Sequence, residues 1–235
     1  EAYKSAMSSR AQELASYTAG LSLGEYSALV AAQAINFEDA LYLVRQRGRF
    51  MEEEALKKPG KMLSVIGLEK DLVQQLSLET NTEIANINCP GQIVISGGVK
   101  EIEQAQAKAK ELGAKMAVIL EVSGAFHSSF MKEAALRLAK EVEKIRINTA
   151  RIPVICNVTA KQASSPDEIR ENLIKQVASS VLWEDSMKFI LSKGIGNFIE
   201  FGPGKVLKGL LRRIDANAQV VSIEKKEDII KLNTN

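Results

Sequence analysis

The regular alternation of strand-like and helix-like segments is the feature that most constrains how this chain can fold. From Lys61 to Val122 the segments are strand KMLSVIG, helix KDLVQQLS, strand TEIANIN, strand QIVISG, helix VKEIEQAQAKAKELG and strand KMAVILEV. The order βαββαβ is the ferredoxin-like arrangement. Because Gly and Pro residues stand at both joins, we expect residues 61–123 to form an inserted subdomain with its own small sheet.

The same alternation extends over the rest of the chain. Before the insert we expect a helix in EAYKSAMSSRAQEL, a strand in SYTAG and helices in GEYSALVAAQA and FEDALYLVRQRGRFMEEEA. After it we expect helix SFMKEAALRLAKEVEKI, strand IPVICN, helices PDEIRENLIKQVA and EDSMKFILSKG, strand NFIEF, helix GKVLKGLLRRI and strand QVVSIE. This order favours a parallel sheet covered on both faces, so residues 1–60 and 124–235 are predicted to form one α/β core.

Composition excludes several classes of function. With 46% hydrophobic residues, the 235-residue chain can bury a substantial core. Lys plus Arg number 31 against 29 for Asp plus Glu, interspersed, so we expect neither a nucleic-acid nor a membrane partner. No apolar run approaches the roughly 20 residues of a membrane span. Cys89 and Cys156 have neither metal-ligand spacing nor the density of a disulfide scaffold, which favours the cytoplasm and no metal site.

The segment TAGLSLGEYSALVAA places Ser22 between Gly20 and Gly24, where the first predicted strand turns into a helix. This is the pattern of a nucleophile elbow, in which glycines permit a tight bend that holds the hydroxyl clear of the backbone. The following helix start supplies free N–H groups, which favour an oxyanion. The pattern equally fits a small residue that lets the strand and the helix pack closely.

A serine nucleophile needs an adjacent base, normally an imidazole. The chain has one histidine, His127, in EVSGAFHSSF between a predicted strand end and a predicted helix start. Loops at this place carry the chemistry of many α/β proteins, although a lone histidine also fits a surface or capping role. The serine hypothesis therefore depends on His127.

Arg47 is a charged residue on an apolar helix face. It lies three or four positions from Leu43, Val44 and Met51, whereas Arg45 and Arg49 fall on the outer faces. An unpaired buried guanidinium would cost several kcal/mol, so Arg47 should meet an anion. That anion is either a carboxylate of the protein or a ligand.

These segments resemble the malonyl-CoA:acyl carrier protein transacylases of fatty acid synthesis and the acyltransferase domains of polyketide synthases. The similar motifs are LSLGEYSAL, LVRQRGRFM, NCPGQIVISG, GAFH, IKQVASSVLW and EFGPGKVLKGL, in that order through nearly the whole chain. Several long motifs in order are more specific than any one of them. The resemblance implies an α/β-hydrolase-like core that carries a ferredoxin-like subdomain.

The resemblance also implies a role for each candidate residue. Ser22 would be the acylated nucleophile and His127 its base, with the imidazole oriented by the backbone carbonyl of Gln176 rather than by an acidic residue. Arg47 would bind the free carboxylate of the malonyl group through a two-pronged contact. Phe126, just before the histidine, would fill the volume that an α-methyl group needs, which favours malonyl over methylmalonyl; ordinary core packing is the alternative.

Two departures from the family pattern stand out. Leu21 precedes the serine where the family commonly has His, so one polar contact is absent. The family also begins with a strand and a Gly-Gln-Gly loop whose Gln N–H completes the oxyanion hole, and this sequence, which opens at Glu1 without Met, has no such segment. We expect that upstream sequence is missing. With Leu23 N–H as the only donor, the loss would be about 2.7 to 4 kcal/mol of transition-state stabilisation.

The expected reaction is acyl transfer in two halves, from malonyl-CoA to Ser22 and from Ser22 to the phosphopantetheine thiol of acyl carrier protein, with no cofactor. One alternative is a thioester hydrolase at the same site. Another is a truncated chain that binds coenzyme A or carrier protein without turnover. GPGKVLKG lacks the spacing of a P-loop, and its Lys205 or Lys208 is at most a docking charge for an acidic carrier protein.

Overall fold

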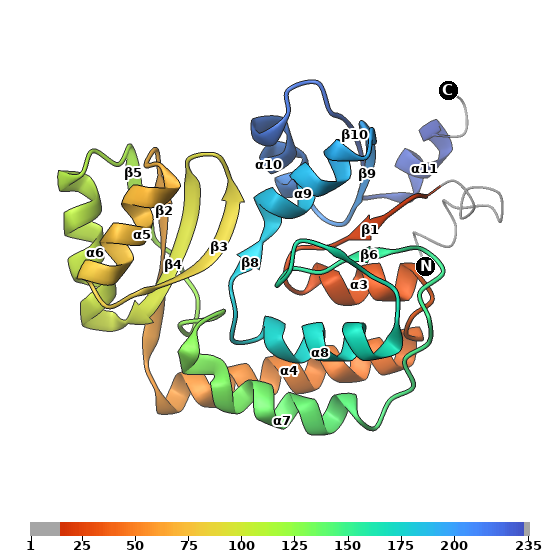
Figure 1. The fold of residues 1–235 in the computed structure, drawn as a ribbon, viewed down its shortest axis with the longest axis horizontal. Coiled ribbons are helices and arrows are strands. Elements are labelled where there is room, and N and C mark those ends of the chain that lie inside the picture. Colours follow the sequence, from red (N-terminus) through yellow and green to blue (C-terminus); the bar gives the residue numbers. More distant parts are fainter. Residues whose placement is uncertain (1–14, 233–235) are drawn as a thin grey trace.

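The computed structural model describes residues 15–232, and the helix expected in EAYKSAMSSRAQEL lies outside these residues. The described residues contain three sheets, with strand orders β5-β2-β4-β3-β8, β1-β6-β7 and β10-β9. The five-stranded sheet stands at one end of the molecule and the two smaller sheets at the other (Figure 1). The fold is therefore a mixed α/β fold, as predicted.

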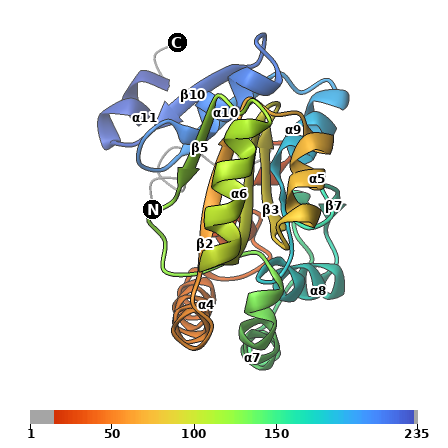
Figure 2. The same ribbon diagram turned by 90° about the vertical axis from the view of Figure 1, so that its left-hand side faces the viewer.

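The five-stranded sheet and its two helices include every element expected between Lys61 and Val122, in the expected order. These elements are β2 (Gly60–Ile66), α5 (Lys70–Glu79), β3 (Glu83–Cys89), β4 (Gln92–Gly98), α6 (Val99–Glu111) and β5 (Met116–Ile119). Figure 2 shows α5 and α6 side by side over one face of the sheet. The fifth strand, β8 (Val181–Leu182), pairs in parallel with β3 and comes from a later part of the chain, which the sequence pattern did not predict.

The other end of the molecule differs from the single parallel sheet that was expected. Strand β1 (Thr18–Ala19) pairs in parallel with β6 (Val154–Ile155), but β6 pairs antiparallel with β7 (Gln162–Ala163). The expected strand IPVICN is only two residues long because Pro153 has no N–H to donate and the Asn157 N–H donates to the Glu25 carboxylate instead of to a strand. Strands β9 (Asn197–Phe201) and β10 (Gln219–Ile223) form a separate parallel pair.

Helices cover these small sheets and form most of the larger core. They are α3 (Gly24–Ala31), α4 (Phe37–Lys57), α7 (Lys132–Val142), α8 (Pro166–Gln176), α9 (Trp183–Ser192), α10 (Val206–Ile214) and α11 (Lys226–Leu232), with a short 3-10 turn η1 (Ser129–Met131) before α7. The largest apolar cluster unites α3, α4, α7 and α8 around Leu29, Leu43 and Leu138. Within residues 15–232, no helix combines the length and the apolar character that crossing a membrane requires.

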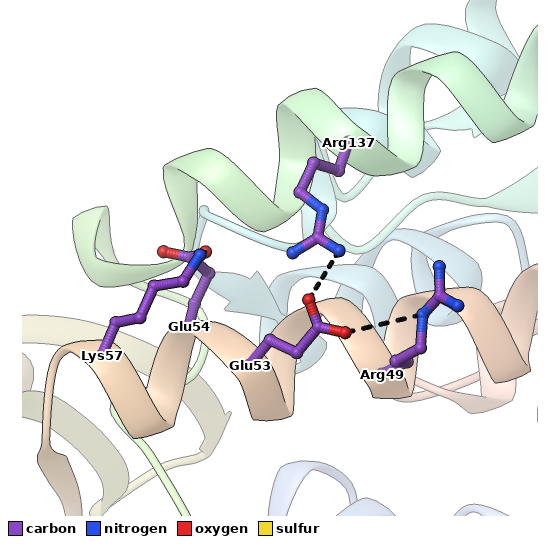
Figure 3. A network of polar contacts seen from close by, with 5 residues as sticks. All are labelled: Arg49, Glu53, Glu54, Lys57 and Arg137. Atoms are coloured by element: carbon purple, nitrogen blue, oxygen red, sulfur yellow. Dashed lines mark hydrogen bonds and ion pairs between the residues drawn. The ribbon is translucent and has the colours of Figure 1, made fainter.

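Helices α4 and α7 are held together by apolar packing with a polar network at its edge (Figure 3). Arg137 of α7 lies 2.6 Å from Glu53 of α4 and over the ring of Phe50, with 4.2 Å to the ring centroid. Arg49 lies 3.7 Å from the same carboxylate and is exposed, as expected for the outer face. Exposed ion pairs contribute only about 0–1 kcal/mol, so the apolar contacts dominate. They fix the helix that carries Arg47.

Candidate active site

The turn between β1 and α3 has the geometry of a nucleophile elbow. Ser22 has a φ of 51°, in the left-handed region that non-glycine residues rarely adopt. A Cβ at Gly20 would lie 2.0 Å from the carbonyl carbon and oxygen of Gly24, so Gly20 is required by space. Gly24 itself has nothing within 4 Å of such a Cβ. Of the two glycines that flank Ser22, only Gly20 is therefore required by space.

Asn157, directly after β6, holds the elbow in this conformation. Its side-chain oxygen accepts a 2.6 Å hydrogen bond from the Ser22 N–H, and its side-chain nitrogen donates to the Gly20 carbonyl at 2.8 Å. Asn157 is fully buried, where unpaired polar groups are costly. Sequence reasoning missed this residue. The available signal was a polar side chain at the carboxyl end of a buried strand, where α/β proteins place functional groups.

His127 lies against the nucleophile, as predicted. Its Nε2 is 2.8 Å from Ser22 Oγ, and its Nδ1 is 2.9 Å from the backbone carbonyl of Gln176. A carbonyl oxygen can only accept, so Nδ1 carries the proton and the Nε2 lone pair faces the hydroxyl. Burial, and secondarily the positive charge of Arg47, lower the pKa of His127 to about 4. The imidazole is therefore neutral at physiological pH and can accept the serine proton.

The loop that carries His127 is supported by the five-stranded sheet. His127 has a φ of 55°, so its backbone is strained like that of Ser22. On one side, buried Ser96 of β4 donates a 2.6 Å hydrogen bond to the Phe126 carbonyl. On the other side, the Glu83 carboxylate of β3 accepts from the Ser129 N–H at 3.0 and 3.1 Å. Both contacts come from the sheet that residues 61–123 mainly build.

Arg47 points into the same place from α4. Only 7% of the residue is exposed, and its Nη2 donates to Ser22 Oγ at 2.9 Å and to the Gln176 side-chain oxygen at 3.2 Å. The described residues give this guanidinium no ion pair, and its buried Nε has no hydrogen-bond partner among them. Burial lowers the pKa of Arg47 from its high ordinary value. The internal ion pair weighed from the sequence is therefore not found in residues 15–232.

A buried polar network lies beneath the elbow. The Gln176 side-chain nitrogen donates to the Ser22 carbonyl at 2.9 Å and to Glu25 Oε2 at 2.7 Å. Glu25 is 1% exposed, and burial raises its pKa to about 7 despite the hydrogen bond from Gln176. Sequence reasoning missed Glu25. A carboxylate within the otherwise small and apolar segment GEYSALVAA, one turn after Ser22, was the available signal.

The remaining predicted residues lie near the cluster with less defined contacts. Leu23 follows Ser22, its side chain is 51% exposed, and its N–H donates to no acceptor within the described part of the chain. Phe126 is half-buried and packs at the junction of the largest apolar cluster and a small one on β2, β3 and β4. Leu21 is half-buried in a third apolar cluster with Trp183.

This arrangement can perform nucleophilic acyl transfer. Ser22, on a strained elbow, contacts the neutral imidazole of His127. Beside it, the Leu23 N–H at the start of α3 has no acceptor within residues 15–232. Attack on a carbonyl requires a nucleophile, a base and an oxyanion donor of this kind. A buried cation with spare donors adds a binding site for an anionic group. Within residues 15–232 there is no group of three or more His, Cys, Asp or Glu residues that could hold a metal ion.

Comparison with known proteins agrees with this chemistry. The acyl transferase domain family matches residues 9–225. The malonyl CoA-acyl carrier protein transacylase of Bacillus subtilis (strain 168) is 44% identical over 218 residues, which cover 91% of this chain and 69% of the relative. The solved structure of the transacylase of the same name from Coxiella burnetii superposes with a TM-score of 0.91 at 35% identity, covering 98% of this chain and 73% of that one.

A second solved structure contains a malonyl-transacylase in complex with a type II PKS acyl-carrier protein. It superposes with a TM-score of 0.89 at 37% identity and covers 94% of this chain and 73% of that one. The family match spans most of the sequence, and the relatives exceed 40% identity over nearly all of it. Sequence, fold and site geometry thus lead to one conclusion: the chain belongs to the acyl transferase domain family.

Proposed function

We propose that this protein transfers a malonyl group from malonyl-CoA to the phosphopantetheine thiol of an acyl carrier protein, through an ester on Ser22. The proposal rests on one observation: Ser22 Oγ lies within hydrogen-bond distance of both His127 Nε2 and Arg47 Nη2. The first contact provides a base for the nucleophile. The second places a cation where the carboxylate of a malonyl ester would lie.

In the first half-reaction Ser22 Oγ attacks the thioester carbonyl as His127 Nε2 takes its proton. The new C–O bond produces a tetrahedral oxyanion, for which the free Leu23 N–H at the start of α3 is the donor in this chain. Collapse of the intermediate breaks the C–S bond. Protonated His127 then returns its proton to the departing coenzyme A thiolate, and Ser22 carries the malonyl ester.

The second half-reaction is the first in reverse with a new thiol. The phosphopantetheine thiol loses its proton to His127 Nε2 and attacks the ester carbonyl. The C–S bond forms, the C–O bond to Ser22 breaks, and the proton returns to the serine oxygen. No redox change occurs and His127 carries the proton in both directions, so no step of the scheme is routed through a metal or a cofactor.

Arg47 selects the acyl group in this scheme. Its buried guanidinium makes no direct ion pair among the described residues, and its unpartnered Nε leaves donors for a two-pronged contact with a carboxylate. Fixing the acyl group in this way also favours a thiol over water in the second half-reaction. Phe126, adjacent to the base, restricts the space for an α-methyl group, a preference of about 1 to 3 kcal/mol.

The architecture supports a finer description of the fold. The strand order β5-β2-β4-β3, with α5 and α6 on one face, supports a ferredoxin-like subdomain over residues 61–123. The elbow between β1 and α3, with parallel β1 and β6, supports an α/β-hydrolase-like core over residues 1–60 and 124–235. We place the reaction in the cytoplasm, where coenzyme A thioesters and carrier protein would meet this chain.

Intact-protein mass spectrometry after incubation with malonyl-CoA tests the function. The wild-type chain should gain one malonyl group, Ser22→Ala none, and Arg47→Ala should lose its preference for malonyl-CoA over acetyl-CoA. Adding carrier protein should move the label to its pantetheine arm. An unlabelled wild-type chain would contradict the proposed enzymatic function. Free malonate formed as fast as malonyl carrier protein would show that the protein is a thioester hydrolase instead.

A further inference from the structure

We infer that Glu25 is a positioning residue that aims Arg47 at the acyl carboxylate, by fixing which way the side-chain amide of Gln176 points. The inference rests on the proposed function, because it concerns how the malonyl-binding cation is oriented. Glu25 itself touches neither Arg47 nor the nucleophile oxygen through a hydrogen bond among the described residues. It acts through Gln176.

The amide of Gln176 has one orientation that satisfies its surroundings. Its nitrogen lies between two close acceptors, Glu25 Oε2 at 2.7 Å and the Ser22 carbonyl at 2.9 Å, with Asn157 Oδ1 more distant at 3.5 Å. Its oxygen faces Arg47 Nη2, a donor, at 3.2 Å. A flipped amide would set its oxygen against two acceptors and its nitrogen against a cation. Glu25 Oε2, which already accepts from the Asn157 N–H, makes that alternative especially unfavourable, because in this buried place it would face the flipped amide oxygen.

Glu25 also ties the amide to the rest of the elbow. The same Oε2 accepts from the Asn157 N–H at 3.2 Å, and the Asn157 side chain holds the backbone just before Ser22, at the Ser22 N–H and the Gly20 carbonyl. One carboxylate therefore connects α3, the segment after β6 and the end of α8. Gln176 belongs to the site twice, because its backbone carbonyl accepts from His127 Nδ1.

The indirect contact leaves Arg47 available to substrate. A carboxylate placed directly on the guanidinium would form an internal ion pair and compete with the malonyl group. An amide oxygen orients one Nη of Arg47 without neutralising it, and Nε has no hydrogen-bond partner among residues 15–232. Because the side chain of Gln176 stands between the Glu25 carboxylate and Arg47, the guanidinium is oriented without being neutralised by an ion pair.

The test compares Glu25→Met with Glu25→Gln by the rates at which malonyl-CoA and acetyl-CoA acylate Ser22. Met keeps the volume but removes the acceptor, so we expect the malonyl rate to fall about tenfold more than the acetyl rate. Gln keeps an oxygen that can accept from Gln176, so its malonyl-to-acetyl ratio should stay within about threefold of wild type. Glu54→Met is the matched control, since Glu54 is also a 1% exposed glutamate but pairs with Lys57, three residues later on α4, and, within the residues described, makes no hydrogen bond with Gln176.

Arg47→Ala in the same assay separates the inference from the proposed function. If Arg47→Ala leaves the ratio unchanged, the malonyl-binding role itself is wrong. If Arg47→Ala lowers the ratio but Glu25→Met lowers both rates equally or neither, only the role of Glu25 is overturned. The role of Glu25 is also overturned if Glu54→Met lowers the ratio as much as Glu25→Met does.

Gln176→Leu keeps the test decisive if Glu25→Met does not fold, which thermal melting would show. Removing the amide should cause the same loss of malonyl preference, because Glu25 acts through it. Where both single variants fold, the double variant should lose no more of the ratio than either single variant. An unchanged ratio in Gln176→Leu, or additive losses in the double variant, would overturn the inference.

Discussion

The two halves of the catalytic pair are supported by different parts of the molecule. Ser22 sits on an elbow held from below by the fully buried side chains of Asn157 and Gln176, which come from the segments after β6 and at the end of α8. His127 sits on a loop held from the side by Ser96 and Glu83, which come from the five-stranded sheet. Figure 1 shows the five-stranded sheet at one end of the molecule, with β6 and α8 beside it.

The difference shows how strain is compensated at each half. Ser22 and His127 both have positive φ values, 51° and 55°, a conformation that costs about 1–3 kcal/mol for residues other than glycine. At Ser22 a closed, buried network supplies the compensation. At His127 the compensation comes from two contacts between the His127 loop and the five-stranded sheet. One of these contacts, between Ser129 and Glu83, is exposed. The 2.8 Å contact between the two residues therefore reports how these units are placed relative to one another.

The largest effect should come from removing a side chain of the buried network that holds the Ser22 elbow. Asn157→Ala removes the partners of the Ser22 N–H and the Gly20 carbonyl, so we expect a loss of about 3 kcal/mol in the free energy of unfolding. Acylation of Ser22 by malonyl-CoA should slow about a hundredfold, as the elbow relaxes. Denaturant unfolding and single-turnover mass spectrometry measure the two. Asn86→Ala, a buried asparagine on β3, serves as control, and an equal rate loss there would refute the assignment.

Removing a hydrogen bond that supports the His127 loop should slow acylation less. Ser96→Ala leaves the Phe126 carbonyl without its donor, and we expect acylation to slow about tenfold because the base shifts while the nucleophile stays in place. Ser77→Ala is the matched control: it is a buried serine on α5 whose hydroxyl has no partner among the described residues. If the two variants acylate at the same rate, the five-stranded sheet does not position His127.

The pH dependence of acylation tests what the two halves share. His127 must be neutral to act as base, and its pKa of about 4 keeps it so at mildly acidic pH. The rate with acetyl-CoA should therefore be maintained below pH 6 and decline toward pH 4. Arg47→Ala removes a positive charge that lowers this pKa, so the decline should move about one unit upward. An unshifted profile would show that Arg47 does not act on the base.

Stability should follow the same pKa. Because the folded-state pKa of His127 lies below its ordinary value, the unfolded chain binds more protons at intermediate pH. The contribution of His127 to the free energy of unfolding is thus fully present above about pH 6.5, the ordinary imidazole pKa, and is lost as the pH falls toward about 4. Burial raises the pKa of Glu25 to about 7, so its contribution to the free energy of unfolding changes in the opposite direction. That contribution is lost as the pH rises toward about 7.

The smallest effect is expected at the exposed contact. Glu83→Gln keeps one acceptor for the Ser129 N–H and removes a charge that water already screens, so acylation should change by no more than about twofold. Single-turnover mass spectrometry of Ser22 acylation at low and high salt measures this change. A loss as large as that of Ser96→Ala would mean that the surface end of the loop, rather than the buried end, holds the base.

Prediction from sequence succeeded where local chemistry decides. The order of elements from Lys61 to Val122, the elbow at Ser22 and the position of the single histidine beside it follow from turn residues, periodicity and the proton that a serine nucleophile would lose. The prediction failed for strands that depend on distant partners. IPVICN forms only two residues of strand, and β8 joins the five-stranded sheet, because both outcomes depend on what lies beside them in space.

The sequence by itself thus determined the class of fold and the candidate residues of the site, since hydrophobic period and side-chain chemistry are properties of neighbouring residues. Only the tertiary structure decided how Glu25 and Asn157 support the site. Glu25 lies 132 positions before Asn157 and 151 before Gln176, and their contacts exist only once three segments pack together. A buried carboxylate is stable only where such partners surround it, and no local pattern specifies that arrangement.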